Sequence, residues 1–195
     1  AVAIIDLNDA NGEAVARSGA SREHNRIALK LDAELRARLK GRACEAFVSD
    51  MRVLVQDTGW FPSPDVALAC GDAQFLDAEV DTLRNPVALI EVLSTSTEGH
   101  DRGRKFAHDR RIRSLLEDVL VAQDRPLVEQ FTRRGETWVL VTFEQLDDAL
   151  TLESAKVQIP LREIYDRVDL AADPPLPRSA RRPEADLTHP ECPDS

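Results

Sequence analysis

The sequence predicts an α/β protein with a mixed sheet (α+β), in which a helix, three strands, a helix and a further strand follow one another, with an additional C-terminal β-hairpin. Two observations support this fold class. Residues 21–39 repeat apolar side chains every four positions, as a helix with one buried face does. Residues 65–70 and 86–93 are continuous apolar runs that are too short for a second such helix, which favours strands buried on both faces.

Length and composition suit a single domain with a real core, because 43% of the 195 residues are hydrophobic and 31% are charged. We predict a domain over residues 1–170 and a disordered, proline-rich tail over residues 171–195. No apolar run approaches the roughly 20 residues of a spanning helix, so we expect no membrane segment. The chain does not begin with Met, which favours a trimmed or incomplete start.

The first helix is expected to begin after Ser21, a good N-cap, and to end before Gly41. Its apolar stripe consists of Ile27, Leu31, Leu35 and Leu39. Glu23 extends that stripe by one turn and His24 lies beside it, so both are expected to point toward the core side, where they can reach a site in the sheet. The alternative is that Glu23 favours the positive end of the helix dipole and His24 bonds locally.

Three predicted strands follow, at residues 44–55, 65–70 and 85–94. Asp65 opens the second strand, and Glu91 lies near the end of the third. If these two strands pair antiparallel with no strand between them, the two carboxylates converge. Glu91 is otherwise an anomaly, since an ionised carboxylate in an apolar run is costly unless it is paired or holds a metal.

The next helix is predicted from Thr95, which has capping-box spacing to Glu98, to about Ile112. Asp101 and Lys105 lie four residues apart and so share one face, where they could also form an ordinary surface ion pair. The remaining expected elements are a short strand at 1–5, a strand at 119–121, a hairpin of 127–131 with 137–143, and a closing helix at 161–168.

The formal net charge of −10 weighs against a wide, sequence-independent nucleic-acid surface, because such binding depends on Lys and Arg neutralising phosphates. A local surface remains open. Residues 99–113 hold five arginines and one lysine against two aspartates, so the second predicted helix is a basic island on an acidic protein. The alternative is a solvated helix face.

Cysteine and histidine usage limits other chemistries. The three cysteines, Cys44, Cys70 and Cys192, have no C-x-x-C spacing, which argues against a disulfide framework or a zinc knuckle and suits a reducing cytosol. We therefore expect a cytoplasmic protein in which two of the cysteines are small buried apolar groups. The four histidines show no zinc-ligand spacing with them. A hydrolase with a Ser or Cys nucleophile is disfavoured, because no G-x-S-x-G elbow occurs.

Taken together, these motifs resemble the putative restriction endonuclease family within the PD-(D/E)XK nuclease superfamily. The likeness runs in order over about residues 18–168. The residues that carry it are Ser21-Arg22-Glu23-His24-Asn25, Pro64-Asp65-Val66, Pro86, Ile90-Glu91-Val92-Leu93-Ser94, Ser96-Thr97-Glu98, Asp101-Arg102, Lys105-Phe106 and Ile164-Tyr165.

The resemblance implies a restriction-endonuclease-like αβββαβ core and a metal-dependent DNA endonuclease. Asp65 and Glu91, with the main-chain carbonyl of Val92, would bind Mg²⁺ or Mn²⁺, hard cations that carboxylates hold. Lys105 would be the third catalytic residue, orienting a water and stabilising developing charge. DNA is the implied partner, and a homodimer is expected because nucleases that cut both strands are often dimers. Accessory site residues would be Glu23, His24 and Asp101.

A second hypothesis keeps the fold but assigns a catalytically inactive protein that binds nucleic acid or another protein. Two positions depart from the family pattern in a way that keeps this hypothesis open: Asp109 replaces the usual aromatic, and Thr95 replaces the usual proline. Both hypotheses predict the same fold. Only the nuclease hypothesis predicts that Asp65, Glu91 and Lys105 meet.

Overall fold

The computed structural model describes residues 5–6, 15–16, 21–48, 51–76, 82–94, 103 and 105–170. Its helices are α1 (Arg22–Leu39), α3 (Phe106–Asp109) and α4 (Leu161–Ile164). Its strands are β1 (Ile5–Asp6), β2 (Val15–Ala16), β3 (Cys44–Val48), β4 (Arg52–Val53), β5 (Val66–Cys70), β6 (Thr82–Leu83), β7 (Ala88–Leu93), β8 (Glu117–Ala122), β9 (Val128–Arg134), β10 (Thr137–Phe143), β11 (Ala149–Leu152) and β12 (Val157–Pro160).

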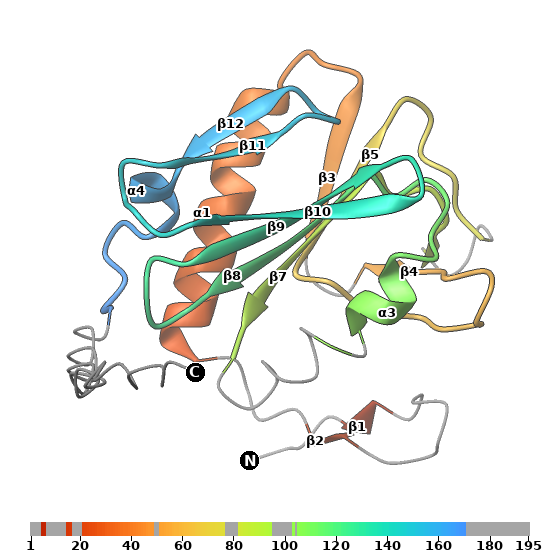
Figure 1. Ribbon diagram of the computed structural model, residues 1–195, viewed down its shortest axis with the longest axis horizontal. Coiled ribbons are helices and arrows are strands. Elements are labelled where there is room, and N and C mark those ends of the chain that lie inside the picture. The colour runs from red at the N-terminus through yellow and green to blue at the C-terminus, as the bar shows by residue number, and fades with distance from the viewer. Residues whose placement is uncertain are drawn as a thin grey trace, which may run out of the picture.

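One six-stranded sheet, in the order β10-β9-β8-β7-β5-β3, organises the described residues (Figure 1). The β7–β8 pair is parallel and the other neighbours are antiparallel, so the sheet is mixed as predicted. Three short pairs, β1–β2, β4–β6 and β11–β12, lie outside it. β7 is buried along its whole length, which explains its uninterrupted apolar sequence around Glu91.

Helix α1 covers one face of this sheet (Figure 1). The hydroxyl of Ser21 accepts a hydrogen bond from the main-chain N–H of His24 at 3.0 Å, which confirms the predicted N-cap. Gly41, just beyond the helix, has φ +75°, a conformation that glycine adopts without strain. The predicted stripe is also confirmed, since Ile27, Leu31, Leu35 and Leu39 are all buried. They pack in one core with strands of the main sheet, β11, β12 and α4.

The opposite face has its own smaller core, built from alternate residues of the same strands. Ala67 and Leu89 point to this side and pack with Val53, Leu83 and Leu115. This face also carries α3. The helix predicted to reach Ile112 ends at Asp109 in the described residues, where the guanidinium of Arg133 donates to the carbonyls of Arg110 and Ile112. These bonds satisfy main-chain groups that a longer helix would have satisfied internally.

Several predicted boundaries were wrong. The strand expected at residues 44–55 is divided into β3 and β4, and the closing helix expected at 161–168 ends at Ile164. The β11–β12 hairpin was not predicted. Predictions for residues 95–102, including Asp101, and for the tail 171–195 lie outside the described residues. In the described part of the chain, no helix combines the length and apolarity needed to cross a membrane.

The cysteine prediction also needs correction, because Cys44 and Cys70 form a disulfide. The register of β3 against β5 sets these two residues directly opposite each other, with Cα atoms 4.0 Å apart. They are 26 positions apart in the sequence, and only the strand pairing brings them together. The argument from free cysteines to a reducing compartment therefore no longer holds.

Candidate active site

Two acidic residues lie on neighbouring segments, Asp65 just before β5 and Glu91 near the end of β7. β5 and β7 are antiparallel neighbours with Val66 opposite Ile90, so the predicted pairing is confirmed and no strand intervenes. Continuing the register by one residue sets Asp65 opposite Glu91. The two carboxylates, which are 26 positions apart in the sequence, therefore arise from adjacent points on the sheet.

At the end of the β5–β7 hydrogen-bond ladder, the Asp65 side chain accepts the bond that a main-chain carbonyl would otherwise accept. Its Oδ2 accepts a hydrogen bond from the main-chain N–H of Val92 at 2.8 Å. The N–H and C=O of one strand residue point to the same edge. The Val92 carbonyl therefore also points toward the Asp65 side of β7. The same Oδ2 lies 3.2 Å from His24 Nε2, which comes from the first turn of α1.

Glu91 forms an ion pair with Lys105 Nζ. Each residue is only 8% exposed, so both charges have lost most of their water. Desolvating two charges costs several kcal/mol per ion, at an order of magnitude, and this cost is offset only when opposite charges are held in good geometry. The ion pair accounts for the carboxylate inside the apolar run of β7. It also brings Lys105, 14 positions further along the chain, to Glu91.

Aromatic packing holds Lys105 in place, and the sequence reasoning missed it. Phe106, the next residue, lies with its ring centroid 4.2 Å from that of Phe131 on β9 and 5.6 Å from that of Trp138 on β10. These contacts anchor the start of α3 on the β9–β10 hairpin. The sequence did contain a signal for this packing. A phenylalanine directly after the candidate lysine fixes the position of that lysine when its ring enters a hydrophobic core.

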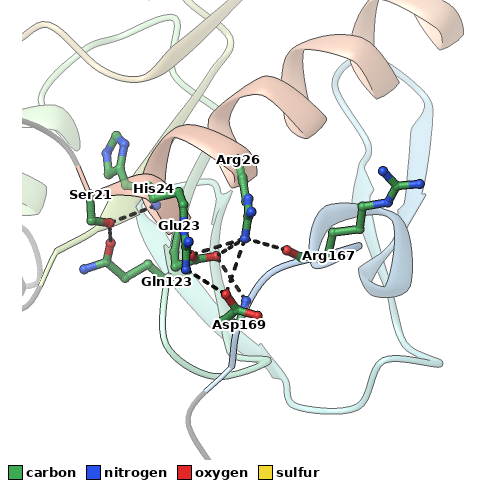
Figure 2. Close-up of polar contacts among 8 residues, drawn as sticks. Ser21, Glu23, His24, Arg26, Gln123, Arg167 and Asp169 are labelled. Carbon is green, nitrogen blue, oxygen red and sulfur yellow. Dashed lines mark hydrogen bonds and ion pairs between the residues drawn. The ribbon is translucent and has the colours of Figure 1, made fainter.

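Glu23 and His24 point in different directions, although they are adjacent (Figure 2). Glu23 accepts hydrogen bonds from Arg22 and Arg26 and from the main-chain N–H of Asp169. The hydrogen bond from Arg22, followed by that from Asp169, lowers the pKa of Glu23. Glu23 therefore ties the start of α1 to Asp169, with Arg26 adding a hydrogen bond to the Arg167 carbonyl, whereas His24 reaches Asp65.

A second buried carboxylate, Glu117 on β8, serves as a comparison. Its Oε1 accepts from Gln130 Nε2 at 3.0 Å and from the N–H of Glu153 at 2.8 Å, and its Oε2 accepts from the N–H and hydroxyl of Ser154. These neutral donors hold the β11–β12 turn on the sheet. Glu91 thus differs from Glu117 in having a cationic partner from a distant element.

Divalent-metal binding by these residues can be judged from their donor atoms. Asp65, Glu91 and the Val92 carbonyl offer only hard oxygen ligands, the set that suits Mg²⁺ or Mn²⁺ and not Zn²⁺. No group of three His, Cys, Asp or Glu side chains in the described residues has the geometry of a metal site. Two carboxylates are nevertheless sufficient for Mg²⁺, which usually keeps several waters and takes one or two carboxylates. The donor set therefore fits.

Comparisons with known proteins place the chain in a family. A model described as putative restriction endonuclease (Uma2) matches residues 4–162. An uncharacterised protein of Synechocystis sp., sll1609, is 35% identical over 131 residues, covering 67% of this chain and 74% of the relative. Another from the same organism, slr1290, is 28% identical over 160 residues, covering 80% of each.

A solved structure of a putative nuclease from Anabaena variabilis has a TM-score of 0.65, covering 79% of this chain and 86% of that one. At 15% identity this likeness concerns the fold, and it confirms the predicted nuclease-like mixed α/β architecture. The family model spans most of the chain, and the family expected from the motifs is the one that matches. The chain belongs to the putative restriction endonuclease family.

Proposed function

We propose that the chain is a metal-dependent DNA endonuclease with Asp65, Glu91 and Lys105 as its catalytic residues. The observation that supports this function is the convergence of two acids and a lysine, from β5, β7 and the start of α3, at one end of the central strands. Phosphodiester hydrolysis builds negative charge on an anionic phosphorus centre, so it requires positive charge placed beforehand.

Asp65, Glu91 and the Val92 carbonyl would hold Mg²⁺ or Mn²⁺. When bound, such a cation neutralises charge on the phosphate and activates a water. Lys105 orients that water and stabilises the charge that develops on the phosphate oxygens. His24, 3.2 Å from the Asp65 carboxylate, keeps that carboxylate oriented toward the site.

The proposed substrate is DNA, and the proposed location is the cytoplasm, where cellular DNA is accessible. We also propose a homodimer, because nucleases that cut both strands of a duplex often use one catalytic centre for each strand. The acidic net charge makes a local contact more suitable than a broad basic surface. The basic residues between 99 and 113 are the sequence feature that supports such a contact.

The experiment is incubation of purified protein with supercoiled and single-stranded DNA in Mg²⁺ or Mn²⁺. We expect cleavage that is lost in chelator and in Asp65→Ala, Glu91→Ala and Lys105→Ala, while circular dichroism reports a folded protein. Lys30→Ala is the matched control, because Lys30 pairs with Asp166 on the surface, and it should cleave like the wild type. Activity that survives all three site substitutions would refute the assignment.

A second candidate function is catalytically inactive binding of nucleic acid or protein on the same fold. It is favoured by one observation, namely that His24 and Lys105 lie against oxygens of Asp65 and Glu91 that a metal would also need. The two functions differ in a measurement that needs no cleavage. A metal site predicts that the melting temperature rises with Mg²⁺ in the wild type and not in Asp65→Asn. An inactive binder predicts no rise in either protein.

A further inference from the structure

Strand β10 is one edge of the main sheet, and its outer edge is open in the described residues. Arg134 and Thr137 are directly opposite each other across a two-residue turn, so alternate residues of β10 bond inward to β9. The N–H and C=O groups of the other residues, Trp138, Leu140 and Thr142, point outward. Within the described part of the chain these outward groups have no hydrogen-bond partner.

β10 also lacks the features that keep edge strands from pairing. Its seven residues, Thr137–Phe143, contain no charge, proline or bulge. Val139, Leu140 and Val141 are each nearly half exposed, with Leu140 at 47%. The opposite edge strand, β3, carries the exposed charge of Glu45 as its second residue and is tied to β5 by the Cys44–Cys70 disulfide. Among the described residues, the β10 edge therefore has the features of a strand that can accept another strand, and the β3 edge does not.

The sequence of β10 is self-complementary about Leu140. In an antiparallel pair with a two-fold axis at this residue, Val139 faces Val141 and Trp138 faces Thr142 of the other copy. The residues that become hydrogen-bonded partners are those whose main-chain groups point outward, so the backbone pattern and the side-chain pattern agree. β-Branched and aromatic cross-strand pairs of this kind stabilise sheets.

Charge selects the orientation of this pair. The turn end of the β9–β10 hairpin, residues 133–136, holds two arginines and one glutamate, whereas residues 144–148 after β10 hold three acids. Antiparallel pairing sets the arginine-bearing end of one copy beside the acidic end of the other. Parallel pairing would bring the acids of both copies together on a protein whose net charge is already −10.

We propose that β10 pairs antiparallel with β10 of a second copy of this chain, with Leu140 on the two-fold axis, so that two sheets join into one. This names the contact surface of the homodimer proposed above. It does not depend on the nuclease activity, because its test measures mass and not cleavage. Isologous contacts of this kind close at two copies, which limits the assembly to a dimer.

The test is light scattering coupled to size exclusion at micromolar concentration, on the full chain. The wild type should have twice the 21.7 kDa monomer mass. Leu140→Lys and Leu140→Glu should each be monomers, because each places like charges opposite each other at the two-fold axis. An equimolar mixture of the two variants should recover the dimer, since Lys then faces Glu. Leu29→Lys, on the 67% exposed Leu29 of α1, is the matched control and should remain dimeric.

The outcomes separate cleanly. A monomeric wild type would overturn the proposal and leave a strand of a different protein as the occupant of the β10 edge. Dimers in both Leu140 variants would place the dimer interface elsewhere. Recovery that fails in the mixture, with both single variants folded by circular dichroism, would reject Leu140 as the residue on the two-fold axis. If a monomeric variant still cleaves DNA, β10 is needed for dimerisation and not for cleavage, and the nuclease proposal stands.

Discussion

The substitution Glu91→Gln tests how much the buried ion pair of Glu91 and Lys105 contributes to the stability of the protein. It keeps the shape of the side chain and removes its charge, so the ammonium of Lys105 would lose the carboxylate that now lies against it. Both residues are 8% exposed, and water can only partly replace that carboxylate. The physical expectation is a folded but less stable protein.

The size of the effect follows from burial. Breaking a fully buried pair by removing one partner costs about 3–5 kcal/mol, and the residual exposure here reduces the expected loss to about 2–4 kcal/mol. A denaturant slope of about 2 kcal/mol per molar urea would convert this loss into a midpoint lower by roughly 1–2 M.

The assay is urea unfolding in chelator, which keeps divalent cations out of the comparison. Glu91→Gln, Lys105→Met and the double variant complete a double-mutant cycle. We expect each single variant to lose stability and the double variant to recover much of it, because it leaves neither charge buried. The coupling energy should then be about 2 kcal/mol or more. A parallel cycle on the exposed Lys30–Asp166 pair should give a much smaller coupling.

A coupling below about 0.5 kcal/mol would refute the reasoning, since that is the range expected of independent sites. It would mean that Glu91 and Lys105 do not depend on each other for burial. A large coupling together with unaffected DNA cleavage in the single variants would confirm the ion pair and refute its catalytic role.

Three further predictions concern the scaffold. Leu31→Ala, in the buried stripe of α1, should lower the free energy of unfolding by about 3 kcal/mol, measured by urea titration. Reducing the Cys44–Cys70 disulfide, whose cysteines are 26 positions apart, should cost about 3 kcal/mol by loop entropy, and a Cys44→Ser variant should show no effect of reductant. The pKa of Glu23 is lowered by Arg22, so its stabilisation is present above the ordinary glutamate pKa and is lost as the pH falls through the lowered value. Glu23→Gln should therefore lose less stability than the wild type between neutral pH and about pH 3, measured by urea midpoints.

Elements governed by neighbouring residues were predictable. The N-cap at Ser21, the stripe of α1 and the turn of the β9–β10 hairpin depend on contacts within a few positions, so local sequence was enough. The buried strand around Glu91 was also recognisable, because a strand covered on both faces has an uninterrupted apolar sequence. The antiparallel pairing of β5 and β7 was a condition that the sequence could not establish, and the structure supplies it.

By itself, the sequence determined the family and the mixed sheet, and it singled out Asp65, Glu91 and Lys105 as candidate site residues. Only the tertiary structure decided how these residues are used. Strand register made Cys44 and Cys70 partners, and the packing of Phe106 on the β9–β10 hairpin brought Lys105 to Glu91. The tertiary structure also separates Glu23 from His24. Glu23 contacts Asp169 in the C-terminal segment, and His24 contacts Asp65. These contacts join segments that are far apart in the chain. The packing of the whole sheet decides which side chains touch, and the neighbouring residues in the sequence do not.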